Sequence, residues 1–323
     1  MTPREDGFSV IICAYTSDRW AELNACVESV AGQTRQPLEV ILVIDGNQAL
    51  RARAEAAFSN VNVVMNAGVR GLSGGRMTGS KLARGRYLAF LDDDAVASLS
   101  WLDGHNSAYA DPNVLGVGGP TRPLWQSPRP AWFPDEFLWI VGCSYLGLPM
   151  DENRIRNPIG ANMSVRADVA ERVGSWAEAL GRGNGSAGTA DETEFAIRAV
   201  RAFEGGYWAF SEQAAVLHTV TPERARWGYF IDRCTLEAGA KALIATLVGT
   251  EDGLASERTY VLRTLPLGVL RGLSDAVRGD REGLRRAGAI VAGLAITAGE
   301  YGRLRLAAKI RQRLALDEPT ASR

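Results

Sequence analysis

A short apolar run that ends in three consecutive carboxylates constrains this chain more than any other segment. Residues 87–91 (YLAFL) lie just after Gly85 and predict a buried strand of a parallel sheet. Asp92, Asp93 and Asp94 come directly after this run. Adjacent acids repel one another, whereas hard divalent cations such as Mg²⁺ and Mn²⁺ select carboxylate oxygens. We therefore predict a metal site at the end of the strand; the alternative is a helix start or a turn, where single Asp residues are common.

Strand-like and helix-like segments alternate through the first hundred residues, with short connections. Apolar runs predict four strands, at residues 8–13, 40–44, 61–65 and 87–91. Apolar residues at helical spacing predict helices at 19–31 and 48–58, and a glycine-rich loop at 66–75 precedes a short helix that ends near Ala83. This order is typical of βαβ units, so we expect an α/β fold with a mostly parallel, Rossmann-like sheet flanked by helices.

The predicted strands share polar or flexible residues at their C-terminal ends: Ala14 and Tyr15, Asp45, Gly68, and the three acids. In a parallel sheet these ends meet at one edge, where open α/β sheets bind ligands. Asp45 would accept a hydrogen bond from a base N–H, and Arg76 would lie against a diphosphate. The glycines from Gly68 onward allow a ligand to approach the backbone closely. Each of these residues is ordinary in a turn or a helix, but together they predict a pocket for a nucleoside diphosphate.

The composition is that of a globular protein. Of the 323 residues, 46% are hydrophobic and 23% charged, and the net charge is −1, so a large core is available and no nucleic-acid surface is expected. The four cysteines lie far apart without a CxxC pair, which argues against a zinc site built on paired cysteines. The N-terminus has no signal-peptide pattern, and the longest apolar stretch, 287–298, is too short to span a bilayer. We expect a cytoplasmic protein with reduced thiols.

Residues 8–95 resemble the family 2 glycosyltransferases, which have the GT-A fold. The segments that match, in order and spacing, are VIICAYT (10–16), EVILVIDG (39–46), NAGVRGLSGGRMTGSKLARG (66–85) and YLAFLDDDA (87–95). The family often has two acids at the end of its second strand, and here the first of them is Ile44.

The resemblance implies a role for each matching residue. Ala14, Tyr15 and Asp45 would contact the nucleoside, with Gly68 in the adjoining loop, and Arg76 would lie near the base or the phosphates. Asp92 and Asp94 are the outer positions of the family's DxD motif: Asp94 would bind the metal directly, with Asp92 nearer the ribose and also a metal-ligand candidate, and Asp93 would complete the nucleotide-sugar site.

The same resemblance makes residues 119–250 the acceptor half of a catalytic domain that spans residues 1–250, with 1–118 as the nucleotide-sugar half. Asn162 lies in a segment (159–166) that resembles one lining the family's donor-sugar pocket. His218 is a candidate metal or diphosphate contact, although a lone histidine is as often part of a core. Tryptophans at 125, 132 and 139 would stack on sugar rings or pin a loop to the core.

Residues 191–198 (DETEFAIR) resemble the family's ED motif with the two acids reversed. By position Glu192 matches the catalytic base and Asp191 its neighbour. Acids in the first turn of a helix also suit the helix dipole, which is the structural alternative. A preceding run, 183–188, fits GxGxxG by letter but does not follow a strand, so we interpret it as a loop and a candidate lid.

Residues 251–323 predict a C-terminal helical extension with arginine-rich faces that alternate with apolar stretches. Such helices lie on anionic membranes, which would make the protein peripheral on the inner face of the membrane. The alternative is packing against the catalytic domain or another subunit of a homo-oligomer.

The sequence thus predicts an inverting glycosyltransferase that uses Mg²⁺ or Mn²⁺ and a nucleotide sugar, with UDP favoured over GDP and dTDP. The metal would assist departure of the diphosphate, and a carboxylate would take the proton of the acceptor hydroxyl. The acceptor is open: a saccharide, a glycolipid or a small molecule. Two alternatives are a sugar-nucleotide pyrophosphorylase, which would normally have a glycine-rich loop after the first strand, and a non-catalytic binding module of the same fold.

Overall fold

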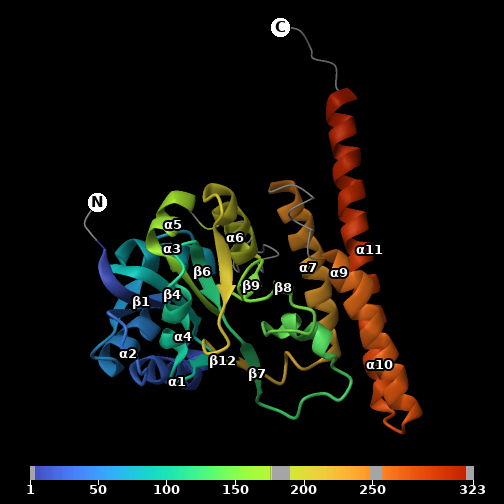
Figure 1. The fold of residues 1–323 in the computed structure, drawn as a ribbon, viewed down its shortest axis with the longest axis horizontal. Helices are drawn as coiled ribbons and strands as arrows, with labels where there is room; N and C mark the ends of the chain where they lie inside the picture. The colour runs from blue at the N-terminus through green and yellow to red at the C-terminus, as the bar shows by residue number, and fades with distance from the viewer. Residues whose placement is uncertain (1–3, 175, 177–189, 248–256, 318–323) are drawn as a thin grey trace.

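The computed structural model describes residues 4–174, 176, 190–247 and 257–317. Its centre is a nine-stranded sheet with the order β3-β2-β1-β4-β10-β6-β11-β9-β8 (Figure 1). The strands are β1 (Glu5–Ala14), β2 (Glu39–Ile44), β3 (Asn62–Met65), β4 (Gly85–Asp92), β6 (Val114–Gly118), β8 (Met150–Asp151), β9 (Arg154–Ile155), β10 (Asn162–Arg166) and β11 (Tyr207–Phe210).

The first four strands along the chain pair in parallel, with β1 between β2 and β4. Strand β10 runs antiparallel between β4 and β6, and β11 is parallel to β6. The sheet is therefore mixed, and its half formed by β1 to β4 is parallel. This confirms the predicted α/β fold.

Helices cover both faces of the sheet, because side chains of a strand alternate between its two faces. Val10 and Ile12 of β1 pack on the side of α1, α2 and α4, whereas Ile11 packs on the side of α3, α5 and α6. The helices are η1 (Ser17–Arg19), α1 (Trp20–Ala31), α2 (Gln48–Ala57), α3 (Leu72–Leu82), α4 (Trp101–Ala108), η2 (Asp135–Val141), α5 (Ala167–Val173), α6 (Asp191–Ala202) and α7 (Trp227–Leu247).

Helix α3 begins at Leu72, inside the loop predicted for residues 66–75. Gly71 has a φ of +118°, a conformation that L side chains rarely adopt, and it turns the chain into the helix. Two glycines of the helix then lie close to β1: a Cβ on Gly75 would lie 3.0 Å from Sγ of Cys13, and a Cβ on Gly79 would lie 2.5 Å from Cγ2 of Ile11. Glycines of this segment, part of which was predicted to be a loop, therefore allow α3 to pack closely on β1.

A second, three-stranded sheet has the order β5-β12-β7, with β5 (Ala95–Ala97), β7 (Thr121–Trp125) and β12 (Val216–Val220). Strand β12 pairs antiparallel with β5 and parallel with β7. His218 lies in the middle of β12, because the pairing with β7 continues to Val220.

The C-terminal segment is helical, as predicted, with α9 (Glu257–Thr259), a π-helical turn η4 (Tyr260–Thr264), α10 (Leu265–Val277) and α11 (Glu282–Asp317). Figure 1 shows α11 continuing beyond the body of the molecule. Phe137 of η2, Phe230 of α7 and Ile290 of α11 share one apolar cluster, so the C-terminal helices pack on the rest of the chain. The predicted lid at 183–188 and the predicted boundary between residues 250 and 251 lie outside the described residues.

Candidate functional site

The ends of β1, β2 and β4 surround a cavity of about 690 Å³, which we term the strand-end pocket. Its lining brings together Ala14, Tyr15, Asp45 and all three acids of the β4 end, with Arg19, Arg70 and Arg224 around them. Tyr15 is 60% exposed, whereas Ala14 is buried. The parallel half of the sheet thus gathers these residues at one edge, as the order of strands and helices predicts.

The three consecutive acids have different surroundings. The Asp92 side chain is 22% exposed, while those of Asp93 and Asp94 are 4% exposed. An oxygen of Asp93 lies 3.0 Å from the Arg19 guanidinium, and Asp94 lies 2.9 Å from the same guanidinium and 3.3 Å from that of Arg224. Burial raises the pKa of Asp93 to about 8, against the opposing charge of Arg19. Asp92 is therefore the most open of the three.

His218 lies beside these acids because of strand pairing. Strand β5 follows the acids directly, and its residue Ala95 is in register with His218 of β12. The Thr219 N–H donates to the Asp94 carbonyl at 2.8 Å, which fixes the two strands at this point. As a result, Nε2 of His218 lies 3.1 Å from a carboxylate oxygen of Asp94.

Asp92, Asp94 and His218 fit a divalent cation, since ligand atoms from the three side chains all lie within 4.8 Å of one another. Burial would lower the pKa of His218, but the charge and hydrogen bond of Asp94 outweigh it and raise the pKa to about 10. Burial would likewise raise the pKa of Asp94, but His218, Arg224 and Arg19 hold it below its usual range. The protonated imidazole of His218 thus supplies a positive charge beside the carboxylates that would bind a metal ion.

Asp45 holds the loop that precedes α3. Its carboxylate accepts hydrogen bonds from the side-chain amide of Asn66 at 2.9 Å and from the Gly71 N–H at 2.8 Å. The Gly68 N–H donates to the side-chain oxygen of Asn66 at 2.9 Å. Asp45 therefore shapes the wall of the strand-end pocket and also faces it, whereas Gly68 is not among the residues that line this pocket.

Arg76 of α3 is not among the residues that line the strand-end pocket; it lines the second cavity described below and lies between Asp92 and α6. Its side chain is 2% exposed, and its guanidinium lies 3.1 Å from Asp191 and 3.9 Å from Asp92. It also donates to the Gly160 carbonyl at 2.9 Å, and the Ser73 hydroxyl donates to Asp191 at 2.9 Å. Asp191 is thus buried and occupied by partners from α3.

Glu192 faces a second cavity of about 210 Å³, which we term the aromatic cavity because Trp139, Tyr145 and Tyr260 line it. Asp92 and Leu72 line both cavities. Desolvation by the cavity walls, together with the negative charge of Asp191, raises the pKa of Glu192 well above its usual range. The aromatic cavity therefore contains a carboxyl group with a raised pKa, and Asp92, which also borders the strand-end pocket, lines the same cavity.

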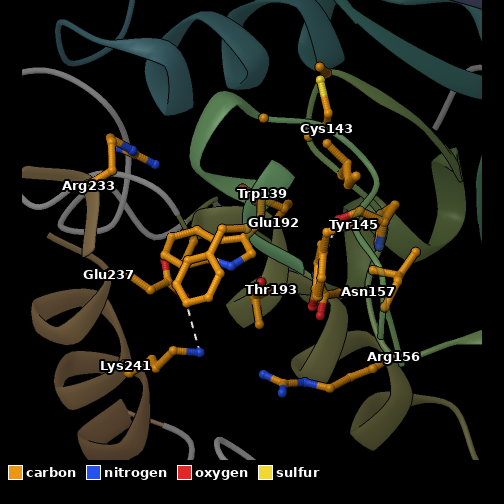
Figure 2. Close-up of a pocket in the computed structure, with 18 of the residues that line it drawn as sticks. Trp139, Cys143, Tyr145, Arg156, Asn157, Glu192, Thr193, Arg233, Glu237 and Lys241 are labelled. Atoms are coloured by element: carbon orange, nitrogen blue, oxygen red, sulfur yellow. Dashed lines mark hydrogen bonds and ion pairs between the residues drawn. The ribbon is translucent and has the colours of Figure 1, made fainter. Parts of the chain in front are cut away.

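Besides Arg76 and His218, three basic side chains line the aromatic cavity. Arg233 and Lys241 come from α7, where residues four and eight apart lie on one face, and Glu237 between them pairs with Lys241 at 3.1 Å. Arg156 reaches the cavity from the segment after β9. Figure 2 shows the ends of Lys241 and Arg156 pointing towards each other across the cavity, with Glu192 and Thr193 between the walls.

Asn162 lies apart from both cavities. It is fully buried; its side-chain oxygen accepts from Trp101 Nε1 at 2.8 Å, and its amide donates to the Ala214 and Pro120 carbonyls at 2.7 and 3.2 Å. It joins β10 to α4 and to the segment before β12, while its neighbours Gly160 and Ala161 line the aromatic cavity.

The three tryptophans have different surroundings. Trp125 and Trp132 pack beside the apolar cluster around Phe133 and Phe230, so they pin a loop to the core. Trp139 also borders this cluster but lines the aromatic cavity, and its Nε1 donates to the Tyr260 hydroxyl at 3.1 Å.

Some site residues were not predicted from the sequence: Arg19, Ser73, Arg156, Arg233 and Lys241. The spacing of Arg233, Glu237 and Lys241 is a signal that the sequence offers, since charged residues four apart in an apolar segment indicate one polar face of a helix.

A mixed, mostly parallel α/β sheet with acids at its strand ends, beside a carboxylate at a helix start, is the architecture of the GT-A fold. Residues 9–174 match the model of "Glycosyl transferase family 2". The chain is also 32% identical over 243 residues to a glucosyl-dolichyl phosphate glucuronosyltransferase of Haloferax volcanii, covering 74% of this chain and 77% of the relative. The chain belongs to glycosyl transferase family 2, and it is a glycosyltransferase.

Two further comparisons agree with this assignment. Glycosyltransferase AglE of Haloferax volcanii is 26% identical over 176 residues, which are 52% of this chain and 55% of that protein. A solved structure of a mannosyltransferase from Pyrobaculum calidifontis, in complex with GDP-Man and Mn²⁺, superimposes with a TM-score of 0.57 at 15% identity, covering 92% of this chain and 89% of the other. This likeness shows a shared fold. Membership of this family argues against the two alternatives considered from the sequence, a sugar-nucleotide pyrophosphorylase and a non-catalytic binding module.

Proposed function

We propose that this glycosyltransferase moves a sugar from a nucleoside diphosphate sugar, with UDP the favoured nucleotide, to an acceptor hydroxyl and inverts the anomeric carbon. The observation that carries the proposal is the position of Asp92, which borders both cavities. A sugar attached to a diphosphate in the strand-end pocket would pass Asp92 and present its anomeric carbon to the aromatic cavity. Glu192 would then face that carbon from the acceptor side.

Asp92, Asp94 and His218 would hold Mg²⁺ or Mn²⁺ in this enzyme. The bound ion would neutralise the charge that builds on the departing diphosphate, so no general acid is needed. As a ligand His218 offers Nε2 without a proton, and its 3.1 Å contact with Asp94 would give way to shared coordination. The Mn²⁺ named with the Pyrobaculum mannosyltransferase supports this proposal.

We assign the proton-accepting role to Glu192 and a positioning role to Asp191. A hydroxyl is a poor nucleophile at neutral pH, and a carboxylate that takes its proton as the bond forms removes this difficulty. A raised pKa suits a base that works near neutral pH, and Glu192 has one. Asp191 already accepts hydrogen bonds from Ser73 and Arg76, so it holds α6 against α3 instead.

The acceptor that fits the aromatic cavity carries an anionic group, such as a phosphate, close to a sugar. Arg156, Arg233 and Lys241 would bind the anion, and the rings of Trp139 and Tyr145 would cover the sugar. The Haloferax relative is named for a glucosyl-dolichyl phosphate, an acceptor of this chemistry, which supports the assignment.

Hydrolysis of nucleotide sugars tests the proposal without knowledge of the acceptor, because water replaces the acceptor hydroxyl. UDP-glucose, UDP-glucuronate and GDP-mannose are incubated with Mn²⁺, and release of the nucleoside diphosphate is followed. For Glu192→Gln we expect hydrolysis to fall by about 10²–10⁴-fold, with nucleotide affinity unchanged. Glu28→Gln, at an exposed position of α1, is the control and should retain activity. Hydrolysis at the wild-type rate by Glu192→Gln would contradict the assignment.

A further inference from the structure

Helix α10 and the turn before it present an apolar stripe to solvent. Leu262 is 75% exposed, Leu270 61% and Val277 90%, and exposed Pro266 and Leu273 lie between them along the chain. Spacings of three and four residues place these five side chains on one side of a helix. The opposite side is used for packing, since Leu265, Gly268 and Gly272 are buried.

Arginines flank this stripe on one side. Arg263, Arg271 and Arg278 each directly follow a stripe residue, so each lies about 100° further round the helix. Arg271 is half-exposed and lies 3.6 Å from Glu136, whereas Arg263 and Arg278 are exposed and have no acidic partner among the described residues. The helix thus has a buried face, an exposed apolar stripe and a basic edge.

The surrounding segment has more positive than negative charge. Residues 258–286 contain seven arginines and three acids, in a chain whose net charge is −1. The acids are already occupied, because Asp275 and Asp280 pair with Arg286 at 2.9 and 2.7 Å, and Glu282 pairs with Arg285 at 2.8 Å. The remaining positive charge around the stripe therefore faces solvent.

We propose that α10 is a peripheral membrane-binding element, which inserts the stripe Leu262–Pro266–Leu270–Leu273–Val277 into the headgroup region of a bilayer that contains anionic phospholipid. An amphipathic helix with a basic edge binds in the plane of such an interface, with apolar contacts and charge attraction both contributing. Figure 1 shows α10 at an edge of the molecule, where a flat surface can reach it. Within the described residues, no helix is long and apolar enough to cross a membrane.

The stripe and the aromatic cavity share one segment of the chain. Tyr260, Val261 and Leu265 line the cavity, while Leu262 and Pro266, the next residues round the helix, face solvent. A bilayer bound at the stripe would therefore lie one helix away from the cavity. This arrangement suits an acceptor carried by a lipid, but membrane binding itself does not depend on the proposed reaction.

Vesicle co-sedimentation of the full chain tests the proposal, with phosphatidylcholine vesicles prepared with and without phosphatidylglycerol. Wild type is expected to sediment with the anionic vesicles. Leu270→Glu combined with Val277→Glu should weaken this partition at least about tenfold, because each buried leucine or valine contributes about that much. The control is Leu99→Glu combined with Val200→Glu, two exposed apolar positions outside the stripe (68% and 42% exposed), which should bind like wild type.

A second pair of variants tests the basic edge. Arg263→Gln combined with Arg278→Gln should reduce binding to anionic vesicles about tenfold or more and leave the weak binding to neutral vesicles unchanged. Arg86→Gln combined with Arg122→Gln makes the same change in net charge elsewhere and should have a small effect. Circular dichroism and thermal melting verify that every variant is folded.

Three results would overturn the proposal. Wild type that stays in solution with anionic vesicles excludes membrane binding by this chain. Stripe variants that bind as tightly as wild type exclude α10 as the element. A stripe variant that turns a dimer into a monomer in sedimentation velocity, with no vesicle binding in either form, assigns the stripe to contact between two copies of the chain.

Discussion

The strand-end pocket and the aromatic cavity meet at Leu72 and Asp92, yet they are built in different ways. Nearly all of the strand-end pocket comes from residues 13–94, where successive strands and helices deliver its walls, and only Arg224 is distant in the chain. The aromatic cavity draws on η2, the segment after β9, α6, α7, η4 and α11. The lining of a pocket made from consecutive βα units can be predicted from the sequence. The lining of a cavity made from scattered segments becomes apparent only in the folded chain.

The two cavities also differ in charge. In the strand-end pocket the acids are bound by the protein's own cations, as Asp94 is by His218, Arg19 and Arg224. The aromatic cavity has four acids and four arginine or lysine side chains, and three of these bases (Arg156, Arg233 and Lys241) come from segments that do not reach the strand-end pocket. The first arrangement suits a metal ion and a diphosphate, and the second suits an anionic acceptor.

Removal of the buried cation at the junction should have the largest effect. Arg76→Ala leaves Asp191 buried without its ion-pair partner, and we expect a loss of about 3–5 kcal/mol in the free energy of unfolding. Urea denaturation measures it. Arg51→Ala, which breaks an exposed pair with Glu55, is the matched control, with an expected loss of about 0.3–0.5 kcal/mol. Equal losses in the two variants would show that the two cavities are not joined through Arg76.

The basic side chains of the aromatic cavity should affect acceptor binding alone. Arg233→Gln or Lys241→Gln removes a charged hydrogen-bond donor, and we expect affinity for glucose 1-phosphate to fall about tenfold. The measurement is calorimetric titration of the enzyme already saturated with nucleotide and Mn²⁺. Lys81→Gln, at an exposed position of α3, should bind like wild type. If nucleotide affinity falls by the same factor as glucose 1-phosphate affinity, the separation of the two cavities is wrong.

The pH dependence should identify the base. Glu192 must be ionised to accept a proton, so hydrolysis of the nucleotide sugar should decline as the pH falls through its raised pKa. Asp191→Asn removes a negative charge that raises this pKa, so activity should persist to lower pH than in wild type. Asp6→Asn, at an exposed position, should not move the profile. An acid limb that stays in place or moves to higher pH in Asp191→Asn would assign the proton to another group.

Much of the fold and of the strand-end pocket follows from the sequence, for physical reasons. The end of each parallel strand is marked by an abrupt change from apolar to polar residues, so Asp45 and the three acids of β4 could be assigned to one edge. The start of α3 could not be predicted in this way. Its glycines allow close packing on Cys13 and Ile11 of β1, and a contact with a distant strand leaves no local pattern in the sequence.

The rest depended on contacts between distant segments. His218 lies inside β12 because that strand pairs with both β5 and β7, which lie more than a hundred residues and 95 residues away in sequence, respectively. Asn162 reads as a polar contact for a sugar, but its amide is used by Trp101, Pro120 and Ala214, which only the folded chain brings to it. The direction of Arg233 and Lys241 is likewise set by the packing of α7 on η2.

Calorimetric titration of wild type and Asp94→Ala with UDP, GDP and dTDP, each with and without Mn²⁺, tests whether the strand-end pocket is a metal-dependent nucleotide site. We predict that one nucleotide binds to wild type, that Mn²⁺ strengthens its binding at least about tenfold, and that Asp94→Ala abolishes the metal effect. Thermal melting verifies that the variant is folded. Binding that is the same with and without Mn²⁺ and in both proteins, or no binding of any nucleotide, would contradict a metal-dependent donor site at the ends of β1, β2 and β4.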